Sequence, residues 1–496
     1  MKRETPVDLP IAATPKFRLL WSASLLMAAV LVLDVIAILF FSQYFNYGAE
    51  GIELASLMRL SDGLPYITRI PEIPWYVNQY SPYFYVIAVL PIRLLGVKSL
   101  AASALCARTS VLLTASALLC CVYRHFEVCF SKRSFVFVSL WFLLLFPANI
   151  ISVRPDFLAF LAEFIAFVAW RMSNGASGSG IRGVSIAGLI FGCALALKLN
   201  TVGVLAGLLI YEAWGRRWMR VSVLVATAAA STLMFLVLAW KIWGVDALRD
   251  TFLAIQNQRE TASELTSRFV VLAAYAIPFG LLLTLGFRRL RQGRVVETES
   301  LLFAIAGSIV VATLQQAKAG SWYNYYYGAI ALALVPASVG LDELFSDLRY
   351  ARLSYATLGL ALLHAVWATR VPVVIARDRF LSHYPFAQAA SWLQSEVPRG
   401  AIYSDDPNAL LHFRARVLLG PNSEIILNLT PALQPFIPQL RRNMRSMPYA
   451  AAIATGPSCA QWRPHGEFRE ETSHLTQLNA HFGWICVFVP PHAAER

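Results

Sequence analysis

The stretch "YSPYFYVIAVLPIRLLGV" (residues 80–97) decides the topology of the whole chain, because every later loop changes sides if it crosses a membrane. It is apolar, but Pro91 and Arg93 interrupt it. A helix needs about 20 apolar residues to cross about 30 Å of hydrocarbon, and this segment is short of that on either side of the interruption. The charges of the loops on either side must therefore indicate whether the segment crosses the membrane.

The composition of the chain indicates a polytopic membrane protein. Of its 496 residues, 57% are hydrophobic and 14% charged, with a mean hydropathy of +0.56, whereas soluble domains have roughly 45–50% and about 25%. The first apolar run is too long for a cleaved signal peptide and lacks a small-residue cleavage site, so we expect a retained anchor. Apolar length predicts spans at 19–41, 100–123, 134–152, 157–171, 183–198, 200–214, 221–240, 269–287, 300–317, 325–341 and 353–374.

The distribution of Lys and Arg favours an interfacial segment 80–97. In that arrangement the inner loops carry 18 Lys and Arg in 69 residues and the outer loops 11 in 99. If the segment crossed, 14 Lys and Arg in 51 residues of short loop would face outward, including "RRLRQGR" at 288–294. The positive-inside rule thus predicts eleven spans, a cytoplasmic N-terminus and an extracytoplasmic C-terminus. It also explains the net charge of +13 without a nucleic acid partner.

Two domains follow: a transmembrane domain (1–374) whose first outer loop (42–98) holds amphipathic helices, and an extracytoplasmic domain (375–496). The second alternates between helical and strand patterns, which predicts a small α/β fold. Helices are expected at 385–397 and 407–415, the latter capped by "SDDP", and strands at 401–404, 416–420, 449–455 and 484–490. Cys459 and Cys486 are placed to form a disulfide if this domain lies outside the cytoplasm.

Four cations lie toward the predicted outer ends of spans: Arg108, Arg154, Lys198 and Lys318. Ionisable side chains at membrane depth cost several kcal/mol. Each cation alone is compatible with snorkelling to the headgroups, but together they would neutralise a phosphate at the outer surface.

Two carboxylates open the first outer loop. Glu50 and Glu53 are three residues apart and share one face of a helix. They form either a solvated face beside Arg59 or a base that takes a proton from an incoming hydroxyl while the cations stabilise a departing phosphate.

The order of these motifs, over residues 19 to about 340, resembles the GT-C superfamily of integral-membrane glycosyltransferases. The motifs are the early acidic residues, "GLPY" (63–66), "YSPYFY" (80–85), "ARTS" (107–110), "RPD" (154–156), "LKLN" (197–200) and "KAGSWYNY" (318–325). The family's Asp-Glu dipeptide stands here as Ala49-Glu50. By position Glu50 is the base, with Glu53 displaced by one turn, so both remain candidates.

The resemblance implies a polyprenyl-phosphate sugar donor and inverting transfer to a hydroxyl of a lipid, glycan or protein, at the outer face of the plasma membrane. Arg154, Lys198, Lys318 and, more weakly, Arg108 would bind the donor phosphate. Aromatic residues near them are membrane-interface anchors or substrate-lining groups, and with Asn324 the lining set is Tyr66, Tyr80, Tyr83, Tyr323, Asn324 and Tyr325. Asp156 would orient Arg154 or hold a divalent cation; the sequence has no metal-binding motif.

Other classes of membrane protein remain as alternatives. A transporter of lipid-linked sugars usually shows repeat symmetry and midplane charges. An O-antigen polymerase or ligase would place its largest soluble loop between late spans, and an export scaffold would carry no chemistry. Here the soluble part is terminal and the polar groups gather on one face, which favours the transferase.

Overall fold

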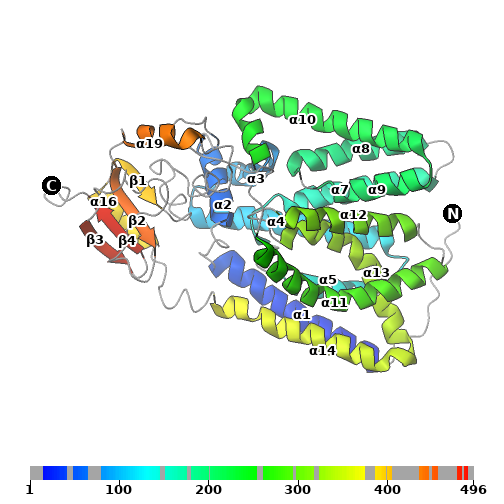
Figure 1. Ribbon diagram of the computed structural model, residues 1–496. Coiled ribbons are helices and arrows are strands. Elements are labelled where there is room, and N and C mark those ends of the chain that lie inside the picture. The colour runs from blue at the N-terminus through cyan, green and yellow to red at the C-terminus, as the bar shows by residue number, and fades with distance from the viewer. Residues whose placement is uncertain are drawn as a thin grey trace.

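The structure is a computed structural model that describes residues 15–41, 49–64, 67, 80–145, 151–175, 180–199, 201–253, 261–293, 298–317, 323–374, 386–397, 399–404, 435–445, 449–455, 477–482 and 485–489. A large helical bundle is joined to a small sheet at one end (Figure 1). Among the described residues, seven helical segments are long and apolar enough to cross a membrane: Arg18–Phe40, Leu100–Phe126, Gly180–Leu197, Trp218–Arg249, Thr298–Gln316, Asn324–Ser346 and Leu348–Val374. The chain is therefore a polytopic membrane protein, as the composition predicts.

Each predicted span contains a helix. They are α1 (Pro15–Ile36, continued by the π-helical η2, Ala37–Phe41), α4 (Leu100–Phe126), α5 (Lys132–Leu145), α7 (Asp156–Gly175), α8 (Gly180–Leu197), α9 (Gly203–Trp214), α10 (Trp218–Leu253), α11 (Ala262–Gly293), α12 (Thr298–Gln316), α13 (Tyr327–Ser346) and α14 (Ala351–Ala368). Large apolar side chains such as Leu33, Leu113 and Leu314 are exposed on the bundle, where lipid replaces water as the solvent.

Glycines allow the helices of the bundle to approach closely. A Cβ atom on Gly286 of α11 would lie 1.7 Å from the carbonyl oxygen of Pro336 on α13. A Cβ atom on Gly207 of α9 would lie 2.1 Å from the carbonyl oxygen of Phe303 on α12. Backbone-to-backbone packing through small residues is how membrane helices associate without a hydrophobic driving force between them.

Two helices form the described part of the first loop: α2 (Ala49–Ser61) and α3 (Pro82–Leu94). The 13 residues of α3 extend about 20 Å at about 1.5 Å per residue, too little to cross the hydrocarbon alone. Ser81 caps its first turn, with Pro82 at the first helical position. Leu94 is 83% exposed at its end, and the interfacial placement of this segment agrees with the helix length.

A four-stranded sheet builds the C-terminal part, in the order β1-β2-β4-β3. β1 (Ala401–Ser404) pairs parallel with β2 (Tyr449–Thr455), and β4 (Ile485–Val489) pairs antiparallel with β2 and with β3 (Gln477–Phe482). Two helices accompany it, α16 (Phe386–Glu396) and α19 (Ile437–Arg445).

Sequence patterns predict α16, β1, β2 and β4. The short, mostly polar segments of β3 and α19 are not among the predicted elements, although β3 alternates polar and apolar residues and α19 is amphipathic. The predicted helix at 407–415, with its "SDDP" cap, and the predicted strand at 416–420 lie outside the described residues.

The sheet and the first-loop helices share one apolar cluster. It contains Leu54 and Leu57 of α2, Val89 of α3, and Ile453 and Val487 of the sheet. Figure 1 shows α2 and α3 at the end of the bundle that faces the sheet, whereas α1 begins at the opposite end. The C-terminal part therefore packs over the end of the bundle where the first loop lies.

Candidate functional site

Glu50 makes a buried ion pair with Arg108 of α4. Arg108 Nε donates to Glu50 Oε1 at 2.9 Å and its Nη2 donates to Oε2 at 3.1 Å, a bidentate arrangement. The backbone amide of Val153 also donates to Oε1 at 3.3 Å, and Arg108 Nη1 donates to the carbonyl oxygen of Ile38 at 2.7 Å. Side-chain exposure is 3% for Glu50 and 1% for Arg108. This pair joins α2, α4, η2 and the segment before α7, and it occupies both oxygens of Glu50.

Glu53, one turn further along α2, has a different environment. It is 6% exposed, and its Oε2 accepts a hydrogen bond from the hydroxyl of Tyr85 on α3. Burial raises the pKa of the Glu53 carboxyl from 4.5 to about 8, although the Tyr85 hydrogen bond and the positive charge of Arg154 act to lower it. A carboxyl with a pKa near neutrality is suited to proton transfer.

Asp156, at the start of α7, binds two groups from distant parts of the chain. Its Oδ1 accepts from Lys198 Nζ, which follows α8, and from Asn324 Nδ2 at 2.8 Å, in the 3-10 helix η5 (Tyr323–Tyr326). The Lys198 ammonium also lies over the rings of Tyr325 and Tyr80, with Nζ 4.9 and 5.9 Å from their centroids. Asp156, Lys198 and Asn324 are all buried.

Arg154 connects this cluster electrostatically to Glu53. Its charge interacts with those of Glu53 and Asp156 and with Tyr80. Arg154 Nε and Asp156 Oδ2 are both buried and have no hydrogen-bond partner in the part of the chain that the structure describes. Buried polar atoms are almost always paired. A guanidinium N–H and a carboxylate oxygen that lie two residues apart and have no partner among the described residues are groups that a polar ligand would engage.

The structure thus unites some of the predicted site residues and separates others. Glu53, Tyr80, Arg154, Asp156, Lys198, Asn324 and Tyr325 form one group, which we call the polar cluster. Arg108 is paired with Glu50 instead. Tyr83 donates to the carbonyl oxygen of Phe235 at 2.6 Å and packs edge-on against Trp243, so it binds α3 to α10.

The remaining predicted residues cannot be placed as side chains. Lys318 and Tyr66 lie outside the described residues, and Tyr323 is placed only as the first residue of η5. Within the described residues there is no group of three or more His, Cys, Asp or Glu side chains arranged to hold a metal ion. Asp156 as a ligand of a divalent cation stays a prediction.

Two residues that are not among the predicted site residues are buried and hydrogen-bonded close to them. Tyr85, within the aromatic run 80–85, is fully buried against Glu53. Glu163, in the middle of α7, is 3% exposed and accepts the backbone N–H of Val204 at 3.0 Å. An acidic residue inside an apolar run was the available signal for Glu163.

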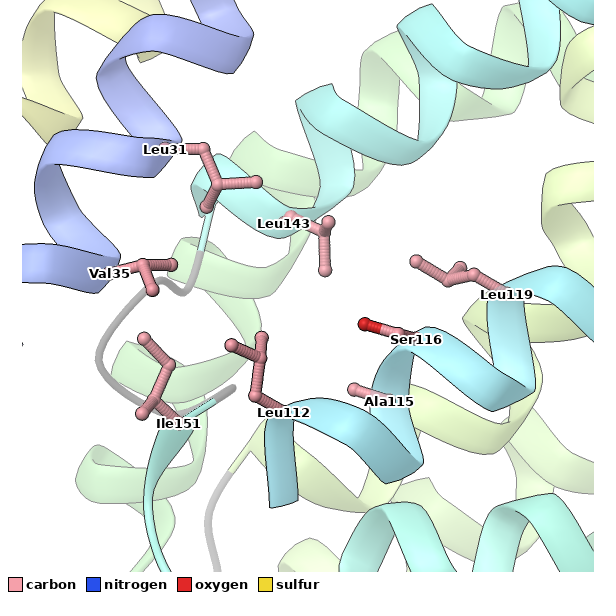
Figure 2. A pocket seen from close by; sticks show the side chains of 8 residues that line it. All are labelled: Leu31, Val35, Leu112, Ala115, Ser116, Leu119, Leu143 and Ile151. Atoms are coloured by element: carbon pink, nitrogen blue, oxygen red, sulfur yellow. The ribbon is translucent and has the colours of Figure 1, made fainter. Parts of the chain in front are cut away.

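A separate apolar crevice opens between α1, α4 and α5. Figure 2 shows the side chains that line it: Leu31, Val35, Leu112, Ala115, Ser116, Leu119, Leu143 and Ile151. Ser116 supplies its one hydroxyl, and Leu112 follows Arg108 by one turn of α4. The crevice suits hydrocarbon and carries no group for chemistry, so the candidate site is the polar cluster.

Comparison with solved structures identifies the fold. No family model and no curated protein matches the sequence. By structure, the chain resembles ArnT from Cupriavidus metallidurans in the apo state, with a TM-score of 0.63 and 12% identity over 94% of this chain and 97% of that one. The same protein bound to undecaprenyl phosphate gives a TM-score of 0.62 and 11% identity over the same shares of both chains. The chain has the GT-C fold. The oligosaccharyltransferase of Archaeoglobus fulgidus, also of this fold, gives a TM-score of 0.52 and 10% identity over 89% of this chain and 70% of that one.

Proposed function

We propose that this GT-C-fold protein transfers a sugar from a polyprenyl-phosphate donor to a hydroxyl acceptor at the extracytoplasmic face of the membrane, with inversion at the anomeric carbon. One observation carries the proposal: a carboxyl of raised pKa, an arginine and a lysine meet in one buried cluster at the end of a membrane bundle. The resemblance to a protein crystallised with undecaprenyl phosphate supports a lipid-phosphate ligand for that cluster.

Glu53 is the base in this mechanism. Its carboxylate takes the proton from the acceptor hydroxyl as the hydroxyl oxygen forms a bond to the anomeric carbon. The bond between that carbon and the phosphate oxygen breaks on the opposite face, and the electron pair leaves with the phosphate. Glu50 fits this role less well because its two oxygens already accept hydrogen bonds from Arg108.

Lys198 and Arg154 receive the phosphate. Lys198 is held by Asp156 and by the Tyr325 ring, and Arg154 keeps an open Nε. Fixed cations in a water-poor site stabilise the charge that develops on a leaving phosphate, which therefore needs no general acid. The negative charge of Asp156 offsets the repulsion between these two cations before the donor arrives. Lys318 remains a candidate for the same role.

The orientation of the bundle supports an outer-face reaction. Arg217 and Arg349 lie in connections between helices, and Arg289 lies in the last turns of α11, all toward the end opposite the polar cluster. Basic residues at such positions are typically cytoplasmic. Cys486 of β4 is disulfide-bonded, whereas the five cysteines of the helical part, Cys106, Cys120, Cys121, Cys129 and Cys193, are free. Cys459, its predicted partner, lies outside the described residues. Disulfides persist in oxidising compartments, so we place the sheet and the polar cluster outside the cytoplasm.

The test is a donor panel. The purified protein in lipid nanodiscs is incubated with polyprenyl-phosphate and polyprenyl-diphosphate sugars, and released polyprenyl phosphate or diphosphate is measured. We expect turnover of a monophosphate donor that is lost in Glu53→Gln. Turnover of diphosphate donors alone would instead support a polymerase or ligase. In sealed proteoliposomes, ATP-free movement of intact donor between the leaflets without turnover would support a transporter.

A further inference from the structure

Glu163 lies deeper in the bundle than the polar cluster but on the same face of α7. It follows Asp156 by seven residues, two helical turns or about 10 Å along the axis. Its carboxylate accepts the backbone N–H of Val204 at 3.0 Å. Val204 is the second residue of α9, and the first amides of a helix have no intrahelical partner. Glu163 therefore caps α9 from a neighbouring helix, at the positive end of the α9 dipole.

The same carboxylate packs against the start of α13. A Cβ atom on Gly328, the second residue of that helix, would lie 3.1 Å from Glu163 Oε2 and 2.9 Å from Phe160 Cδ1. The contact therefore depends on glycine at this position. Glu163 is held between the beginnings of α9 and α13.

Lys198 lies just before α9 and Asn324 lies just before α13, and both side chains donate to Asp156. Lys198 precedes Val204 by six residues, and the turn between them is closed where the Lys198 carbonyl accepts from Thr201 N at 3.1 Å and Thr201 Oγ1 at 2.8 Å. Asn324 precedes Gly328 by four residues. Asp156 thus binds the two side chains, and two turns deeper Glu163 contacts the backbones that carry them.

We propose that Glu163 is a positioning residue: by fixing the start of α9 it holds the Lys198 ammonium where the donor phosphate binds. This inference depends on the function proposed above. Glu163 touches neither donor nor acceptor in this role. Its removal should weaken phosphate binding while the proton transfer at Glu53 is retained.

The experiment compares Glu163→Ala with Glu163→Gln. The affinity for undecaprenyl phosphate and the kcat and KM for the donor are measured in nanodiscs. We expect Glu163→Ala to weaken undecaprenyl phosphate binding and raise the donor KM by about tenfold, with kcat nearly unchanged, a loss typical of one well-placed hydrogen bond. Glu163→Gln should restore binding, because its amide oxygen still accepts the Val204 N–H.

Asp342→Ala is the matched control. Asp342 of α13 also binds the start of a neighbouring helix, α5: it accepts from Ser131 N at 2.6 Å and from the Ser131 and Ser134 hydroxyls at 2.6 and 2.7 Å. It lies 18 residues beyond Asn324, toward the opposite end of α13. Its removal should lower stability without changing the affinity for undecaprenyl phosphate. Equal loss of affinity in Asp342→Ala and Glu163→Ala would reduce Glu163 to a general stabilising residue and overturn the proposal.

The double variant with Lys198→Met separates this inference from the proposed function. If Glu163 acts through Lys198, Glu163→Ala should weaken binding no further once Lys198 is Met. Fully additive losses would overturn the positioning role. Unchanged binding in Lys198→Met alone would overturn the phosphate role of Lys198, and this proposal with it.

A second variant covers the case in which Glu163→Ala does not fold. Gly328→Ala places a methyl group against Glu163 Oε2 and should weaken undecaprenyl phosphate binding in the same direction. Wild-type affinity in a folded Gly328→Ala would count against the proposal.

Discussion

Glu50 and Glu53 lie one turn apart on α2, yet Glu50 is bound by a buried guanidinium and Glu53 by a buried tyrosine hydroxyl. The first arrangement stabilises an ionised carboxylate that holds helices together. The second leaves a carboxyl whose pKa is raised to about 8. Two residues of one type thus have different tasks because their partners differ.

Substitution by glutamine should separate these tasks. Glu53→Gln should lower kcat by about 10²- to 10⁴-fold, the usual contribution of a general base, with little change in thermal stability. Glu50→Gln leaves Arg108 buried without a counter-charge and should cost about 3–5 kcal/mol of stability. Transfer assays and thermal unfolding of the two variants check this. An inactive but fully stable Glu50→Gln, beside an active Glu53→Gln, would return the base to Glu50.

The raised pKa of Glu53 predicts opposite pH dependences of activity and stability. As the base, Glu53 must be ionised, so kcat/KM should rise with pH and level off above about 8. The folded-state pKa exceeds the ordinary value of 4.5, so protonated Glu53 favours the folded state. Its stabilising contribution is complete below about 4.5 and is lost as pH rises through about 8.

Comparison with Glu53→Gln isolates this group from others that titrate in the same range. From pH 6 to pH 9, the melting temperature of the wild type should fall relative to that of Glu53→Gln. A constant difference across that range would show that Glu53 does not titrate there.

Tyr85 should tune the base. Its hydrogen bond to Glu53 lowers the pKa of that carboxyl, so Tyr85→Phe should raise the pKa further and move the rise in kcat/KM to higher pH. Tyr83→Phe is the control, since Tyr83 lies on the same helix but binds the Phe235 carbonyl. An alkaline shift of equal size in both variants would indicate a general disturbance of α3.

The orientation of the bundle can be read with cysteine labels. Arg442 on α19 and Arg291 at the end of α11 are both exposed. In intact cells, a membrane-impermeant maleimide should label Arg442→Cys and leave Arg291→Cys unlabelled, relative to the parent protein with its native cysteines. The reverse pattern would place the polar cluster on the cytoplasmic side.

Sequence reasoning found the bundle because crossing hydrocarbon imposes a length and an apolar composition that no other function requires. It found the set of cations for the same reason, as charges at membrane depth stand out. It could not assign their partners: Arg108 was expected at a phosphate and is paired with Glu50. Which partner a cation has depends on how each helix is rotated about its axis. That rotation cannot be predicted from the positions of charges at the ends of spans. β3 was missed even though "QLNAHF" alternates polar and apolar residues, the pattern of a half-buried strand.

Lys198 should bind the donor phosphate directly. Lys198→Met keeps most of the side-chain volume and removes the ammonium, and it should weaken undecaprenyl phosphate binding by about 10- to 100-fold, as expected for about 1.5–3 kcal/mol per charge-assisted hydrogen bond. Lys241→Met is the control, because Lys241 is an exposed lysine near the end of the α10 span. Removing Lys198 also leaves Asp156 buried without its cation, so Lys198→Met with Asp156→Asn should recover stability but not binding. Recovery of binding in that double variant would mean that Lys198 serves only to neutralise Asp156.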